Sequence, residues 1–164
     1  MLAVIAGALL YYQQVYAYYT PVQAEAEDVR LTNLVTGTAD PILFDGFAGI
    51  DADSSPIRYR ACFTTPLSQA MLTETFIIRD DAAPLVAPSW FDCFDAEQIG
   101  ADIQDGSAIA FLGVENITYG IDRLVAVYPD GRAFAWHQIN DCGDVVFDGD
   151  PTPDHCPPAP EGLN

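Results

Sequence analysis

Lysine is absent from this sequence, and no charged side chain occurs before Glu25. The rest of the chain carries 24 acidic residues against 6 arginines, which gives a formal net charge of −18 at pH 7. A negative field of this size repels nucleic acids and anionic lipid surfaces, and it attracts basic proteins. We therefore expect no nucleic-acid partner.

The usual catalytic and cofactor-binding motifs are also absent. The chain has no G-x-S-x-G, no Gly-rich loop ending in a lysine, no H-E-x-x-H and no dinucleotide-binding glycine pattern. Acidic pairs such as Asp51/Asp53 are too numerous to single out a catalytic pair. Asp51–Ser55 begins like a calcium loop, but Pro56 occupies the glycine position, so an Asx-turn explains it better. The sequence predicts no enzyme, metal or cofactor.

The uncharged N-terminal segment is apolar, and five tyrosines lie between Tyr11 and Tyr19. As one helix, residues 2–19 would rise ~27 Å, close to the ~30 Å of a bilayer's hydrocarbon core. The tyrosines resemble half of an aromatic belt at the membrane–water interface. We expect an uncleaved single transmembrane helix at residues 1–20. A cleaved signal peptide, suggested by Val22-Gln23-Ala24, and a helix buried in a soluble protein are the alternatives.

Four cysteines are present, Cys62, Cys93, Cys142 and Cys156, and none forms a C-x-x-C pair. An even number without zinc-ligand spacing predicts two disulfides and an oxidising compartment. Of three possible pairings we favour Cys62–Cys93 and Cys142–Cys156, since the second would close an acidic tail loop. A redox or metal site at His155-Cys156 is the alternative, and the adjacent prolines disfavour it.

The remaining pattern predicts an α+β fold, with a small antiparallel sheet and one or two short helices. We divide the chain into an anchor (1–20), a connector (21–40), a domain (41–147) and an acidic, Pro-rich tail (148–164). Predicted strands cover 31–35, 58–63, 75–79, 107–113, 124–128, 132–138 and 145–147, with a hairpin turn at Pro129–Gly131. Predicted helices cover 67–72, capped by Thr65, and 96–105, which begins with an Asp95/Gln98 capping box and stops at Gly106.

Five arginines lie in this domain: Arg58, Arg60, Arg79, Arg123 and Arg132. We expect them to pair with carboxylates, and a clamp for an anionic ligand is the alternative. His137 lies on a predicted strand opposite Phe134 and Trp136. We expect a core on the aromatic face and a polar surface on the other, with no haem or metal at His137.

Four segments, Gly49–Pro56, Arg58–Phe63, Leu85–Asp95 and Tyr119–Asn140, resemble an uncharacterised family of alphaproteobacterial membrane-anchored periplasmic proteins, classed as a domain of unknown function. The resemblance implies a membrane-anchored periplasmic domain and no assigned activity. Some relatives carry a histidine-kinase label. We set that label aside because a sensor kinase needs a phosphoacceptor histidine on a dimerisation helix and a nucleotide-binding domain.

We therefore expect a non-catalytic accessory or assembly subunit of a bacterial inner-membrane complex, with its acidic domain in the periplasm. Respiratory and photosynthetic electron-transfer complexes are the candidates. Ala3 and Gly7, one helical turn apart, would contact an integral membrane protein. A basic periplasmic protein, such as a c-type cytochrome, would bind the tail acids Asp148, Asp150, Asp154 and Glu161. A periplasmic ligand-binding module is the alternative, followed by an enzyme that uses paired acids.

Overall fold

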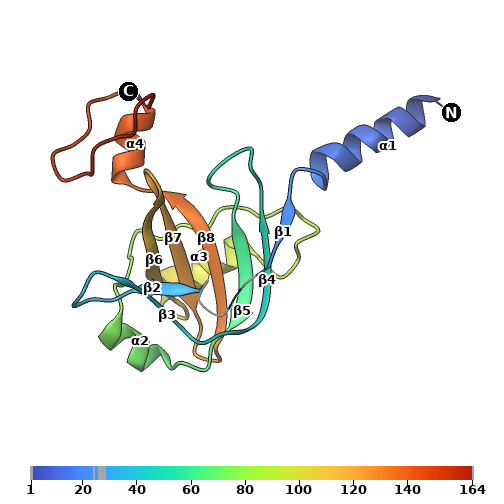
Figure 1. Ribbon diagram of the computed structural model, residues 1–164. Helices are drawn as coiled ribbons and strands as arrows, with labels where there is room; N and C mark the ends of the chain where they lie inside the picture. Colours follow the sequence, from blue (N-terminus) through green and yellow to red (C-terminus); the bar gives the residue numbers. More distant parts are fainter. Residues whose placement is uncertain (1, 24, 26–28, 164) are drawn as a thin grey trace.

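An antiparallel sheet of six strands forms the centre of the molecule (Figure 1). The structure, a computed structural model, describes residues 2–23, 25 and 29–163. The sheet consists, in spatial order, of β1 (Thr20–Val22), β4 (Asp45–Asp51), β5 (Arg60–Thr64), β8 (Arg132–Ile139), β7 (Ile121–Val127) and β6 (Ile109–Thr118). A separate pair, β2 (Arg30–Thr32) and β3 (Ala39–Pro41), packs beside β6. The predicted α+β class is confirmed.

The β7–β8 hairpin is present where the Pro-Asp-Gly signal predicts it. The Tyr128 amide donates to the Arg132 carbonyl at 2.9 Å, and Gly131 has a φ of 88°. A Cβ at Gly131 would lie 2.6 Å from the carbonyl oxygen of Thr65. Glycine is therefore required both for the left-handed conformation and for the close approach of the chain.

Both faces of the sheet are buried, because different elements cover them. On one face, Phe63 packs with Leu31 of β2 and Leu72 of α2 (Gln69–Thr75). On the other face, Trp136 packs with Ile99 of α3 (Ala96–Asp105). The prediction that β8 would have one polar face is wrong, since the fold covers that face with β2 and α2.

Local capping signals place α3 as predicted, but α2 begins later than predicted. The Asp95 side chain accepts from the Gln98 amide, and Gly106 ends α3 in the left-handed conformation. The cap of α2 is Ser68 and not Thr65, whose hydroxyl instead donates to the Leu43 carbonyl. Because α2 continues to residue 75, the predicted strand at 75–79 is reduced to two isolated bridges.

The last element, α4 (Asp141–Phe147), corrects the predicted strand at 145–147. Asn140 caps α4 by accepting from the Gly143 amide at 3.0 Å. Gly143 lies against Gly120, so close that a Cβ on Gly120 would be 2.5 Å from the Gly143 Cα. The cap and this glycine contact hold α4 against the β6–β7 turn.

The N-terminal helix is shorter than predicted. It runs over α1 (Leu2–Val15), 14 residues that rise ~21 Å. Within the described residues, no helix has both the length and the apolarity that a membrane crossing requires, which corrects the expected transmembrane helix. Turn residues follow α1 and lead into β1, which pairs with β4. Ala24 and part of the expected connector lie outside the described residues.

Candidate functional site

Both predicted disulfides are present. Cys62–Cys93 links β5 to the loop before α3, and Cys142–Cys156 links α4 to the tail. No free cysteine occurs among the described residues. The first bridge joins elements of the core, whereas the second restrains a terminal segment.

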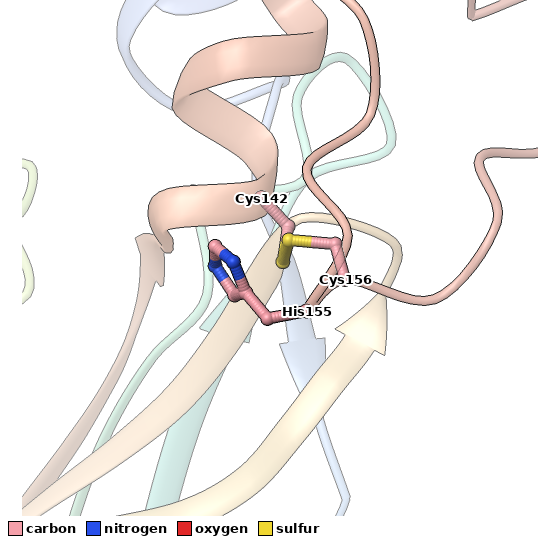
Figure 2. A group of neighbouring side chains, drawn as sticks. All are labelled: Cys142, His155 and Cys156. Atoms are coloured by element: carbon pink, nitrogen blue, oxygen red, sulfur yellow. A yellow bond between two sulfur atoms is a disulfide. The ribbon is translucent and has the colours of Figure 1, made fainter.

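His155 lies beside the second disulfide, as Figure 2 shows. The nearest ligand atoms of Cys142, His155 and Cys156 all lie within 4.8 Å of one another. A soft metal would need thiolate sulfurs, and here the two sulfurs are bonded to each other. The group therefore acts as a covalent restraint on the tail while the bridge is intact.

The residues expected to bind partners occupy two separate regions of the surface. Ala3 and Gly7 are exposed on α1, and a Cβ on Gly7 would meet nothing within 4 Å. The tail acids Asp148, Asp150, Asp154 and Glu161 are exposed as well, beyond α4. Figure 1 shows α1 and the tail extending from different sides of the sheet. The structure does not bring the two sets together.

The end of α1 is attached to the domain through Trp90. The indole Nε1 of Trp90 donates to the Val15 carbonyl at 2.7 Å, so it satisfies a backbone group that the helix end leaves unpaired. The Trp90 ring stacks on Tyr16 at 5.6 Å and meets Tyr19 edge-on at 5.9 Å. The Arg58 guanidinium lies 5.8 Å from the centre of the Tyr19 ring. We call these five residues the helix junction.

Next to the helix junction, Arg60 is buried and bonded to backbone carbonyls instead of a carboxylate. Its guanidinium donates to the carbonyls of Ile57, Tyr59, Leu85 and Val86 at 2.6–3.2 Å. Burial lowers the pKa of Arg60, and the electrostatic attraction of Tyr19 and Asp51 partly opposes this effect. Arg60 thus ties the β4–β5 loop to the segment that leads to Trp90.

A stack of Arg123, Tyr59 and His137 lies beside these groups. The Arg123 guanidinium is 3.9 Å from the Tyr59 ring centre, and the His137 ring stacks on Tyr59 at 4.7 Å. Nε of Arg123 donates to Nε2 of His137 at 3.1 Å, while Nδ1 of His137 lies 2.7 Å from the Pro56 carbonyl. A neutral imidazole that carries its proton on Nδ1 satisfies both contacts. Burial, and then the charge of Arg123, lower the pKa of His137 to about 4.

A second polar network is centred on Asp122. Its buried carboxylate accepts from Arg79 at 2.7 Å, from the Asn140 side chain at 2.7 Å and from the Asn116 amide at 2.9 Å. Arg79 also makes a double contact with Asp81, which lowers the Asp81 pKa. A hollow of about 260 Å³ adjoins the network and includes His155 in its lining. Arg79 and Asp122 in this lining are bound to each other, and the Asn140 contact links the network to the start of α4.

The expected pairing of arginines with carboxylates holds for only part of the set. Arg79 and Arg132 have carboxylates at 2.7 and 2.8 Å. Among the described residues, Arg58, Arg60 and Arg123 have no carboxylate within 4 Å. Sequence reasoning missed Trp90 and the Arg123–His137 contact altogether. Trp90 lies 75 residues from its partner Val15, and no local pattern encodes such a contact.

A family model described as a family of unknown function (DUF6446) matches residues 29–157. The match covers more than half of the chain, so the chain belongs to that family. No curated protein and no solved structure matches the chain significantly. The matched region contains the whole Arg–Tyr–His stack and both disulfides, while α1 lies before it.

Proposed function

We propose that this member of a family of unknown function is an accessory subunit of a bacterial inner-membrane complex, attached to the membrane by α1 and carrying its acidic domain on the periplasmic side. One observation carries the proposal. The helix α1 has no charged residue and no buried residue, and its apolar side chains point in all directions. Leu2, Val4 and Leu10 are 86%, 75% and 56% exposed. Such a helix is unfavourable in water and is stable in lipid or against another apolar helix.

The helix junction supports the same proposal, because it resembles a membrane-interface belt. Tyr16, Tyr19 and Trp90 gather where α1 meets the domain. Tyr and Trp favour the boundary between lipid and water, since each has an apolar ring and a polar group that needs a partner. A helix of ~21 Å would then enter the hydrocarbon region from this boundary. Insertion into lipid would cover the apolar surface of α1. Contact through Ala3 and Gly7 with an integral membrane protein would cover it as well.

The compartment and the type of partner follow from other features. Two disulfides favour an oxidising compartment, which in a bacterium is the periplasm. A net charge of −18 favours a basic partner, such as a c-type cytochrome, and that preference connects the protein to electron-transfer complexes. We assign the chain no reaction, because its buried charged groups bind one another or the backbone. The hollow next to Asp122 is the observation that would favour a ligand-binding module, and Arg79 and Asp122 in its lining are bound to each other.

Membrane attachment is tested by charging α1 in the full-length protein. Wild type should stay with membranes after a carbonate wash, and its N-terminal peptide should be found there by mass spectrometry. Ile5→Glu combined with Leu9→Glu should move the protein to the soluble fraction, because burying two carboxylates in lipid is costly. The control is Val35→Glu with Leu43→Glu, which charges two exposed apolar residues far from α1 and should leave the protein on the membrane. A wild type that washes off, or a mature form beginning near Glu25, contradicts the proposal.

A further inference from the structure

The arginines of this acidic protein are unevenly placed. Arg79 and Arg132 are paired with carboxylates, and Arg30 donates to the Ala39 carbonyl. The other three are Arg58, Arg60 and Arg123, and they share electrostatic neighbours. The charges of Arg58 and Asp51 affect the pKa of Arg60. The charges of Arg60 and Arg123 both lower the pKa of His137. Among these three, Arg58 is the one whose guanidinium lies over a residue that follows α1, Tyr19.

Arg58 is the member of this group best placed to bind an external anion. Arg60 is buried, and its guanidinium is occupied by four backbone carbonyls. Arg123 uses Nε on His137 and lies flat on Tyr59. Arg58 is half-buried, lies over the Tyr19 ring, and makes no carboxylate contact within 4 Å in the described part of the chain. Its guanidinium therefore retains donors for a ligand.

From this placement we propose that Arg58, at the helix junction, binds the phosphate of an anionic phospholipid headgroup. The inference rests on the proposed membrane attachment, because it uses α1 to bring the junction to the headgroup layer. Tyr16, Tyr19 and Trp90 would mark the interface, and Arg58 lies against Tyr19 at that level. A guanidinium donates to two phosphate oxygens at once, and stacking on an aromatic ring leaves its edge free to do so.

Charge complementarity explains why a cation is needed at this position. A domain of net charge −18 is repelled by the anionic surface of a bacterial membrane. Arg58, Arg60 and Arg123 supply positive charge beside the Asp51 carboxylate, and of the three the half-buried Arg58 would face that surface. One arginine near an anionic bilayer strengthens binding about fivefold at moderate ionic strength. Figure 1 shows the acidic tail leaving the same end of the sheet as α1, at the opposite edge.

The test uses full-length protein and co-flotation with two kinds of vesicle. One is pure phosphatidylcholine, and the other is phosphatidylcholine mixed with phosphatidylglycerol. Arg58→Gln should weaken binding to the phosphatidylglycerol vesicles about fivefold and leave binding to phosphatidylcholine unchanged. Arg58→Lys should restore only part of the loss, because it returns the charge without the paired donors of the guanidinium. The matched control, Arg132→Gln, removes the same charge from the exposed hairpin and should behave like wild type on both vesicles.

The outcomes separate this inference from the proposal on which it rests. Equal losses on both vesicles, or equal losses for Arg58→Gln and Arg132→Gln, overturn the Arg58 site while the membrane attachment stands. If inorganic phosphate abolishes the effect of phosphatidylglycerol and sodium chloride at the same ionic strength does not, a phosphate-binding contact is supported; equal effects of the two salts overturn it. A wild type that floats with neither vesicle contradicts membrane attachment itself, and the Arg58 site falls with it.

Discussion

At the scale of the residue, the fold constrains the protonation of His137. It is 7% exposed, accepts from Arg123 and stacks on Tyr59. The charge of Arg60 also acts on His137. Arg60 and Arg123 both interact electrostatically with Asp51 as well. Burial raises the pKa of Asp51. A proton on the His137 ring would break the contact with Arg123 and place two cations together.

Acidification should therefore destabilise the fold through His137. The folded-state pKa is about 4, below the ordinary value of 6.5, so the unfolded chain binds more protons between these values. The stabilisation is nearly complete at pH 6.5 and decreases as the pH falls to 4, by about 3 kcal/mol in total. Urea unfolding across this range should show a smaller loss in His137→Asn than in wild type. The only other histidine supplies the control, since His155→Asn should follow the wild-type profile. Parallel profiles for wild type and His137→Asn would contradict the assignment.

At the scale of the element, local signals predicted structure well and long-range packing decided the rest. The start and end of α3 and the β7–β8 turn each depend on side chains within a few residues, so the sequence was sufficient. The run Val145–Phe147 indicated a strand because three apolar residues cannot distinguish strand from helix. The Asn140 cap, four residues before Asp144, was the missed signal for α4. The contacts that define the helix junction join residues far apart in sequence and could not be predicted.

The two disulfides should differ in their effect on stability, because they join different elements. Cys62–Cys93 spans 31 residues and is anchored in β5, where Cys62 packs with the core beside Trp136. Replacing both cysteines with serine should cost about 2–5 kcal/mol in urea unfolding. Cys142–Cys156 spans 14 residues and restrains the tail. Its removal should cost less, since the tail can open while the sheet stays folded.

Proteolysis distinguishes local opening from global unfolding in these variants. Without Cys142–Cys156, cleavage should appear first after α4 while the sheet is still intact. The tail would then be held by weaker contacts, such as the hydrogen bond from the Tyr119 hydroxyl to the Pro157 carbonyl. Without Cys62–Cys93, cleavage should follow global unfolding. Equal losses of stability for the two double variants would contradict this division of roles.

At the scale of the whole molecule, charge is unevenly distributed along the chain. The helix α1 has no charge, whereas acidic residues are frequent in the rest of the chain, including the tail. The tail acids are exposed and lie beyond the last helix, so the core does not depend on them. Exposed charges act over ~8 Å at physiological ionic strength. Their contribution to binding should therefore appear in the association rate and in its dependence on salt.

Neutralising the tail should slow association with a basic c-type cytochrome. The variant replaces all four acids together, as Asp148→Asn, Asp150→Asn, Asp154→Asn and Glu161→Gln. Association measured by stopped flow over a salt series should be slower at low salt and less dependent on salt, with the free energy of unfolding nearly unchanged. The control removes the same charge from exposed acids elsewhere, Asp45, Asp80, Asp92 and Glu74, and should have a smaller effect if the tail is the binding region. Identical rates for wild type and the neutralised tail would exclude electrostatic recruitment by the tail. Bulky replacements of Ala3 and Gly7 would then test whether α1 alone holds the subunit in its complex, because large side chains would prevent a second helix from approaching α1 closely.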